Sequence, residues 1–245
     1  MYEEEIVTGI VLYGSDLKEY DRRLVILTKE RGKITVFANG ARRMNSRFLA
    51  ATRSYAMGSF TVRPGRDSYT LMKAEITERF SELEADIEKL CYAAYFCEFM
   101  SYYTREGDFC VNHLNLLYTA LKALIAGHQP LSLIRNIYEL RLMALEGQGL
   151  FADRCVLCGA EKATVYHGTK GGMLCEDCAK KTPGGRRLSE TVLYTLSYIA
   201  VSPFEKLFSF NLKEEAAAEL SAVVEDFRGR YVERQFNSLE ILKGL

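Results

Sequence analysis

The chain of 245 residues lacks any uninterrupted apolar run near the roughly 18 residues that a membrane span needs. Its first residues, MYEEEIV, are acidic where a secretory signal would be basic. Internal repeats and low-complexity tracts are also missing. These absences predict a cytoplasmic protein with no membrane partner. Hydrophobic residues at 48% and charged residues at 26% are typical of a globular protein, and the length favours two or three small modules.

The sequence has no net charge, since 32 Lys and Arg residues balance 32 Asp and Glu residues. The charges are unevenly distributed, however. Between residues 22 and 66 a single acid, Glu30, faces eleven basic residues, namely Arg22, Arg23, Lys29, Arg31, Lys33, Arg42, Arg43, Arg47, Arg53, Arg63 and Arg66. Such a local excess is typical of a surface that binds a polyanion. The alternative is a solvated basic face, because exposed Lys and Arg also deter edge-to-edge pairing of sheets.

Motifs that carry enzymatic chemistry are missing too. The sequence contains no Walker phosphate loop, no nucleophile elbow and no Gly-x-Gly-x-x-Gly. The basic segment offers almost no carboxylates that could hold catalytic metal ions. We therefore expect a protein that is not an enzyme. A metal-dependent nuclease is the competing enzyme class, and an RNA-binding module is the competing binding class, because charge does not separate DNA from RNA.

Four of the seven cysteines form two Cys-x-x-Cys pairs, Cys155 with Cys158 and Cys175 with Cys178. Two residues between paired cysteines let one tight turn aim both thiolates at one ion, and Gly159 allows the chain to turn beneath the metal. Two such pairs complete a tetrahedron. The spacing therefore predicts one zinc ion, and because four cysteine ligands leave no open position, we expect this zinc to be structural.

The three other cysteines of the chain, and the histidine that lies within this motif, are expected to bind no metal. An odd number of cysteines in a reducing compartment argues against a disulfide framework, so Cys91, Cys97 and Cys110 are interpreted as small buried residues. His167 lies between the two pairs and is interpreted as a loop histidine without a metal contact. No His-x-Glu precedes the second pair, so the arrangement of zinc deaminases is absent.

Residues 1 to 80 predict a small β-barrel. Five short runs rich in strand-forming residues cover 6–12, 24–28, 34–38, 59–62 and 69–72, with turns at Lys29–Gly32 and Pro64-Gly65. Five strands in so short a stretch favour an OB-fold, which commonly binds oligonucleotides on one face. The turn after the second strand would project Lys and Arg, and the GARR run with Arg47 would supply contacts to phosphates. Such contacts position a nucleic acid without reading its sequence.

From residue 81 onward the pattern is helical, so the expected fold class is α+β. Ser81 followed by Glu84 is a capping-box signature for a first helix that fades near Gly107. Further helices are expected at 111–126, 131–146 and 189–200, and from 212 with Asn211 as the cap. The expected domains are an OB-fold at 1–80, a helical domain at 81–150 and 184–245, and a four-cysteine zinc module at 151–183 inserted into that helical domain.

The sequence resembles the RecO family of bacterial recombination mediators. The resemblance rests on GIVLYGSDLKEYDRRLVILTKERGKITVFANGARRMNSRF at 9–48, on IYELRLMALEGQGLFADRCVLCGA at 137–160, and on the order barrel, helices, four-cysteine module, helices. It covers nearly the whole chain, and its most specific part is the segment with GARR and Ser46. One departure is LAATRSYAMG at 49–58, which does not follow the leucine-proline pattern associated with this loop.

The resemblance implies a protein of DNA repair and recombination, in the bacterial nucleoid, that binds single- and double-stranded DNA and anneals complementary strands. It also implies that the partner RecR joins it in loading the RecA recombinase onto DNA coated by single-strand-binding protein. The DNA-binding candidates carried over are Lys29, Arg31, Lys33, Arg42, Arg43 and Arg47. The C-terminal tail of single-strand-binding protein would bind the helical domain, but we expect the aromatic residues at 92–103 to be ordinary core or surface residues rather than its pocket.

Overall fold

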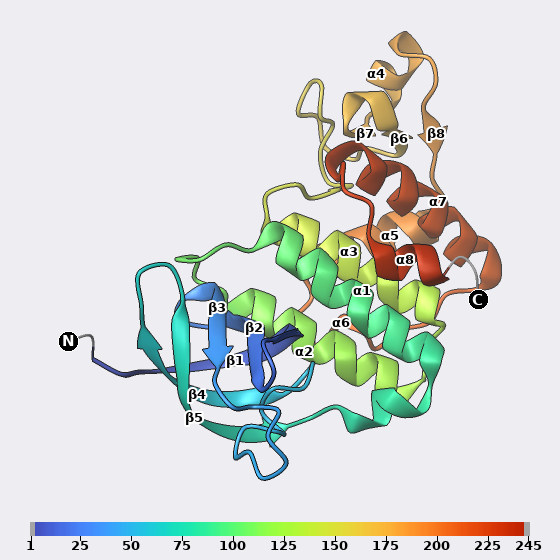
Figure 1. Ribbon diagram of the computed structural model, residues 1–245. Helices are drawn as coiled ribbons and strands as arrows, with labels where there is room; N and C mark the ends of the chain where they lie inside the picture. The colour runs from blue at the N-terminus through green and yellow to red at the C-terminus, as the bar shows by residue number, and fades with distance from the viewer. Residues whose placement is uncertain (1–2, 243–245) are drawn as a thin grey trace. The chain divides into compact units, whose positions relative to one another are not determined.

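The computed structural model describes residues 3–242 (Figure 1). The described chain divides into two compact units. The first contains the residues up to Ile125 together with 236–242, and the second contains Ala126–Gln235. The domain boundaries that we expect from the sequence remain a prediction.

The N-terminal strands of the first unit form a closed barrel (Figure 1). The strands are β1 (Glu5–Leu17), β2 (Asp21–Thr28), β3 (Gly32–Ala38), β4 (Met57–Pro64) and β5 (Tyr69–Glu78). Their order around the barrel is β1-β2-β3-β5-β4, and β4 closes the barrel by pairing with β1. The β3–β5 pairing is parallel and all others are antiparallel. This five-stranded barrel confirms the prediction of an OB-type fold.

Alternation along β3 explains how the barrel acquires a core. Ile34, Val36 and Ala38 are buried, whereas Lys33, Thr35 and Phe37 on the opposite face of the strand are only half-buried. Because successive side chains of a strand point to opposite faces, the first set fills the interior together with Leu24, Ile26, Phe60 and Val62 of the neighbouring strands. The second set lies on the outside of the barrel.

The connection between β3 and β4 contains turns rather than a regular helix. Its start is fixed because the Gly40 amide donates to Asp21 Oδ1, at 2.8 Å. Its end is fixed against β1, where the Tyr55 amide donates to the Val11 carbonyl at 2.8 Å. Tyr55 has a φ of 67°, which turns the chain sharply into β4. The segment 49–58, which does not follow the leucine-proline pattern of the family, therefore forms turns that lead into the first residues of β4.

The first helical segment begins differently from the prediction. Ser81 and Glu84 lie in a short 3-10 helix, η1 (Ser81–Ala85), and Phe80 before it has a φ of 51° and makes no side-chain cap. The long helix α1 (Ile87–Tyr103) begins after Asp86, whose carboxylate accepts from the Glu88 amide at 3.0 Å and the Lys89 amide at 3.2 Å. The capping-box prediction is wrong because Phe80 is fully buried and fixes the chain in another geometry just before the box.

Helix α1 is buried on most of its circumference. Tyr92, Tyr95, Phe96 and Phe99 are all buried, and Phe236 returns from the end of the chain to contact Tyr95 and Phe99 with ring centroids 5.5 Å away in both cases. The unit is completed by α2 (Val111–Ala126) and α8 (Asn237–Leu242). These aromatic residues are therefore core, as we expect from the sequence. Cys91, Cys97 and Cys110 are likewise buried.

The second unit contains α3 (Leu131–Leu145), α5 (Glu190–Val201), α6 (Phe204–Leu207) and α7 (Glu214–Tyr231), with the cysteine module between α3 and α5 (Figure 1). Helix α5 lies where a helix at 189–200 is predicted, and Ser189 caps it, because the Ser189 hydroxyl accepts from the Val192 amide. Asn211 does not cap α7, since its side-chain amide donates to the His128 carbonyl at 3.1 Å and the cap position is Lys213. The predicted cap is thus wrong because a tertiary hydrogen bond takes its side chain.

Buried charge joins the helices of this unit. Glu139 of α3 is 1% exposed and lies 3.5 Å from Arg135 of the same helix and 3.3 Å from Arg228 of α7. Arg141 of α3 donates to the carbonyls of Ile199 and Ser202, each at 3.1 Å, at the C-terminal end of α5. No helix among the described residues is long and apolar enough to cross a membrane.

Candidate nucleic-acid interface and metal centre

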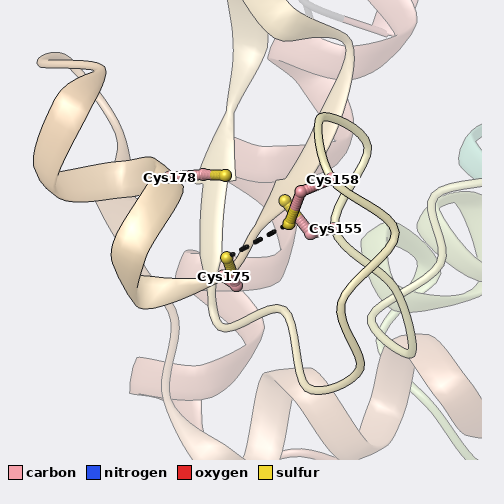
Figure 2. A group of neighbouring side chains, drawn as sticks. All are labelled: Cys155, Cys158, Cys175 and Cys178. Atoms are coloured by element: carbon pink, nitrogen blue, oxygen red, sulfur yellow. Dashed lines mark hydrogen bonds between the residues drawn. The ribbon is translucent and has the colours of Figure 1, made fainter.

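Two chain segments bring the four predicted cysteine ligands together (Figure 2). Cys155 and Cys158 lie on a tight turn that closes when the Gly159 amide donates to the Cys155 carbonyl at 2.9 Å, with Gly159 at a φ of 72°. Cys175 follows β7 (Gly172–Leu174) as the residue before α4 (Glu176–Lys181), and Cys178 lies in the first turn of that helix. Each Cys-x-x-Cys pair thus aims two sulfurs at one point, as the spacing predicts.

The distances between the sulfurs fit a tetrahedral metal site. All four Sγ atoms lie within 4.8 Å of one another, and the Sγ atoms of Cys158 and Cys175 are 3.7 Å apart. A zinc ion with Zn–S bonds of about 2.3 Å requires S–S edges of roughly 3.8 Å. A disulfide would require about 2.05 Å instead. The geometry therefore suits four thiolates around one zinc ion, and among the described residues it is the only such group of potential metal ligands.

The backbone around the cluster favours a thiolate. Burial raises the pKa of the Cys155 thiol, but hydrogen bonds from the amides of Cys175, Cys158 and Leu157 outweigh burial and lower that pKa to about 6. The pKa of Cys178 is raised to about 12, because its sulfur shares hydrogen bonds with Cys158 and Cys175. A cation among the four sulfurs would replace the shared protons and stabilise every thiolate.

His167 does not belong to the cluster, as we expect. It ends β6 (Val165–His167), is 5% exposed, and lies 3.1 Å from the Pro183 carbonyl through Nε2 and 3.2 Å from the Thr169 hydroxyl through Nδ1. Both ring nitrogens therefore have hydrogen-bonding partners other than a metal.

The six basic candidates of the barrel lie at two ends of β3. Lys29, Arg31 and Lys33 lie at the β2–β3 turn, whereas Arg42, Arg43 and Arg47 follow the other end of β3. This strand has seven residues, which at about 3.3 Å per residue separates the two groups by roughly 20 Å. Proximity in the sequence therefore produces two basic clusters rather than one.

The cluster at the β2–β3 turn makes contacts within the fold. The Lys33 ammonium donates to the carbonyl and, at 3.2 Å, to the hydroxyl of Ser101 near the end of α1. Arg31 forms an ion pair of 2.8 Å with Glu5, whose hydrogen bond raises the pKa of the Arg31 guanidinium. Lys29 is exposed. Two of these three cations are thus held by neighbouring groups of the first unit.

The cluster after β3 is open to solvent. Arg42, Arg43 and Arg47 are all exposed. Arg42 lies 3.3 Å from Asp16, whereas no described carboxylate lies within ion-pair distance of Arg43 or Arg47. Arg43 lies over the ring of Tyr20, with 5.6 Å between the guanidinium carbon and the centroid, and Arg47 donates to the Met72 carbonyl of β5 at 2.9 Å.

Acids from outside residues 22–66 neutralise much of the local charge excess. Asp16 pairs with Arg22 as well as Arg42, and four further arginines of the window pair with acids beyond it, namely Arg31 with Glu5, Arg53 with Glu84, Arg63 with Glu4 and Arg66 with Asp67. Counting charge along the sequence therefore overstates the positive field of the folded barrel. Of the three exposed arginines after β3, Arg43 and Arg47 are left without a carboxylate among the described residues.

The structure places further residues beside that cluster that sequence reasoning did not select. Arg23 of β2 pairs in register with Phe37 of β3, and Phe37 pairs in turn with Thr70 of β5, so these side chains share the outer face of the barrel. Tyr20, in the turn before β2, is 44% exposed and lies under Arg43. The signal in the sequence is the register of β2 and β3, which becomes known only once the pairing is known.

These features define a class of proteins in which an OB-type barrel is joined to a helical domain that carries a four-cysteine module. The model of the family described as Recombination protein O N terminal matches residues 1–80, and the model described as Recombination protein O C terminal matches residues 84–240. The chain therefore belongs to the RecO family of DNA repair proteins. This membership confirms the resemblance seen in the sequence and supports a role in DNA repair and recombination.

Relatives match the chain over nearly its whole length. The DNA repair protein RecO of Acetivibrio thermocellus is 30% identical over 241 residues, which cover 97% of this chain and 96% of the relative. The DNA repair protein RecO of Desulforudis audaxviator is 30% identical over 96% of this chain and 94% of the relative. That of Alkaliphilus metalliredigens is also 30% identical, over 96% of this chain and 97% of the relative. The similarity thus extends over both units.

Proposed function

We propose that the chain is a non-catalytic mediator of recombination that binds single- and double-stranded DNA and anneals complementary strands. The observation that carries this proposal is the exposed group Arg42, Arg43 and Arg47 beside the outer face of β3. Arg43 and Arg47 have no carboxylate partner among the described residues, so their charge is available to phosphates. Family membership makes DNA the expected polyanion.

The physical basis of annealing is neutralisation of charge. Two complementary strands repel each other through their phosphates, and a basic surface that contacts both lowers this repulsion. Base pairing then supplies the sequence recognition, and no covalent step is required. The half-buried Phe37 and the exposed Tyr20 offer ring faces on which unpaired bases could stack without sequence preference.

Arg42, Arg43 and Arg47 are the DNA contacts that the fold supports best. Lys29, Arg31 and Lys33 remain predicted contacts carried over from the family resemblance. Lys29 is exposed, while Arg31 and Lys33 would have to exchange their present hydrogen bonds with Glu5 and Ser101 for phosphates.

The partners that we propose follow from the family. RecR would assist this chain in loading RecA onto DNA coated by single-strand-binding protein, whose C-terminal tail would bind the helical region. The zinc ion that we propose at Cys155, Cys158, Cys175 and Cys178 would be structural, because four thiolates fill its coordination sphere and hold the turn at 155–159 against α4.

The proposed DNA face is tested by binding across a salt series. We expect Arg42→Ala/Arg43→Ala/Arg47→Ala to weaken binding of a labelled single-stranded oligonucleotide in fluorescence anisotropy. Each lost phosphate contact should reduce the slope of log K against log salt by about 0.7, so the variant should lose about 2 in slope. A competitor RNA of the same sequence in the same titration separates the DNA-binding proposal from an RNA-binding module.

The matched control removes three other exposed cations of the barrel. Arg63→Ala/Arg66→Ala/Lys73→Ala removes the same formal charge, but each of these residues lies beside a carboxylate, Glu4, Asp67 and Glu75 respectively. This control should keep most of the affinity and the slope. Equal losses in the two triple variants would show a nonspecific effect of net charge and would refute the assignment of the DNA face.

A further inference from the structure

A charged cavity lies in the second unit, which contains none of the residues proposed to bind DNA on the barrel. It has a volume of about 340 Å³ and lies between β6, the segment that leads into β8 (Arg186–Arg187), and helix α7. Its lining includes Tyr166, Gly168, Arg186, Asp226 and Arg230. The side chains come from three segments of the sequence, so the fold itself assembles the cavity.

One arginine of the cavity is fixed in orientation. Arg230 donates to Asp226 Oδ2 through Nε at 3.0 Å and to Oδ1 through Nη2 at 2.8 Å, and the Tyr166 hydroxyl donates to the same carboxylate at 2.6 Å. The Arg230 ion pair holds the pKa of Asp226 below its usual value. These bonds hold the guanidinium in one orientation, and its Nη1 takes no part in the two hydrogen bonds to Asp226, so that a preorganised cation lines the cavity.

A second arginine adds net positive charge. Arg186 lines the cavity, makes no ion pair or side-chain hydrogen bond with the described residues, and is close enough to Asp226 to lower the pKa of that carboxyl further. Since Asp226 is neutralised by Arg230, the charge of Arg186 is uncompensated. Two lysines lie close in sequence to the lining: Lys170 follows Thr169, and Lys181 comes shortly before Pro183. Both also lack an ion pair among the described residues.

Glycines bring the backbone close to these side chains. A Cβ on Gly168 would lie 2.3 Å from Asp226 Oδ2 and 2.4 Å from Arg230 Nη2, so any other residue there would displace the ion pair. Gly184 has a φ of 98°, which residues with a side chain rarely adopt, and its amide has no hydrogen-bonding partner among the described residues. Close backbone approach with a spare amide beside guanidinium groups is an arrangement that suits phosphate binding.

We propose that this cavity binds a phosphate group, presented either by a nucleotide or by a nucleic acid. Donors that come from different segments suit the several oxygens of a phosphate better than the two oxygens of one carboxylate. The site goes beyond the proposed function, because it lies on the unit with the cysteine module and needs no contact with the barrel. It would give each chain a second position at which to hold a strand.

The direct test is an NMR titration of the full-length, zinc-loaded, ¹⁵N-labelled protein with inorganic phosphate. We expect saturable shifts of the Gly168 and Gly184 amides in the wild type. Arg186→Gln should raise the dissociation constant for phosphate about tenfold, which is the size expected for one lost charge-assisted hydrogen bond. Absence of saturable shifts at these amides would refute the proposal.

The neighbouring arginine supplies a matched control. Arg187 lies on the same two-residue strand but pairs with Glu176 and does not line the cavity, so Arg187→Gln removes the same charge one residue away. It should leave phosphate binding within twofold of the wild type. Equal weakening by both variants would refute a specific site. An acidic peptide that shifts these amides where phosphate does not would also refute it.

Two further probes identify the source of the phosphate. If the site binds the backbone of a nucleic acid, Arg186→Gln should weaken binding of an oligonucleotide with a 5′-hydroxyl end. If the site binds a terminal phosphate or a free nucleotide, the variant should weaken binding of dAMP and of the 5′-phosphorylated oligonucleotide only. Because inorganic phosphate and dAMP do not require the barrel, a failure of the barrel to bind DNA would leave this test unaffected.

Discussion

Lys33 illustrates how tertiary contacts change the meaning of a basic residue. From the sequence it is a candidate DNA contact, while in the fold its ammonium donates to the carbonyl and hydroxyl of Ser101. The main chain there is tied down as well, because the Lys33 amide donates to the Arg105 carbonyl at 3.0 Å. A cation at this position therefore fastens the β2–β3 hairpin to the end of α1.

We expect Lys33→Met to lower the free energy of unfolding by about 2 kcal/mol, because a charge-assisted hydrogen bond is lost while most of the aliphatic stem remains. Urea denaturation of the full chain measures the change. Lys29→Met is the matched control on the same turn, where the exposed ammonium makes no described contact and the expected change is below about 0.5 kcal/mol. Unchanged stability of Lys33→Met with weakened DNA binding would instead assign Lys33 to the DNA face.

The ion pair between Glu78 and Lys122 joins two elements, the end of β5 and helix α2. The atoms Glu78 Oε2 and Lys122 Nζ are 2.6 Å apart, and the ammonium also lies 5.2 Å from the Phe80 ring centroid. The hydrogen bond from Lys122 lowers the pKa of Glu78, and the same bond raises the pKa of Lys122. The pair is partly exposed, so its contribution should be below about 1 kcal/mol.

This coupling should depend on pH in a defined direction. A lowered carboxyl pKa contributes stability that is present above the unfolded value and lost as pH falls through the folded value. The raised pKa of Lys122 contributes stability that is lost only as pH rises through that value. A double-mutant cycle of Glu78→Gln and Lys122→Met should show coupling at pH 7 that disappears in acid below the Glu78 pKa. A coupling that grew in acid would contradict this account.

Helices and strands could be predicted from the sequence where local signals decide them. Helix α2 covers Val111–Ala126 as predicted, because Gly127 and Pro130 end it without help from the rest of the fold. The start of α1 could not be predicted from the Ser81–Glu84 box, because the burial of Phe80 fixes the preceding backbone. The Asn211 cap failed for the same reason, since its amide bonds to His128, 83 residues away.

The candidate sites differ in how far the sequence determines them. Metal geometry follows from the spacing of Cys155, Cys158, Cys175 and Cys178, because each pair lies within one turn. The charge distribution of the barrel does not follow from the sequence, because acids such as Glu4, Glu5 and Asp16 pair with arginines distant in the sequence only after folding. A window along the sequence therefore identifies the basic segment but not which of its cations remain available.

Removal of zinc should affect the cysteine module before the barrel. We expect one zinc ion per chain, and we expect Cys158→Ser or a strong chelator to lower zinc content and to speed hydrogen exchange at 155–178 while strands β1–β5 stay protected. Cys91→Ala is the control, because it removes a buried cysteine outside the cluster and should leave zinc content unchanged. Full zinc occupancy in Cys158→Ser would contradict the four-cysteine site.

At the scale of the whole molecule, the two units divide the proposed tasks. The barrel carries exposed arginines beside ring faces, and the second unit carries the metal cluster and the charged cavity. An annealing protein must hold more than one strand, and two separate groups of cations within one chain offer positions for both. Membership of the RecO family and identity of about 30% over both units support a role in DNA repair.

The measurement that tests the central claim most directly is annealing of two complementary oligonucleotides coated with single-strand-binding protein. The wild type should accelerate annealing, Arg42→Ala/Arg43→Ala/Arg47→Ala should lose most of the acceleration with unchanged folding, and the Arg63→Ala/Arg66→Ala/Lys73→Ala control should retain it. No acceleration by the wild type, or undiminished acceleration by the first variant, would contradict the account of annealing on the barrel face.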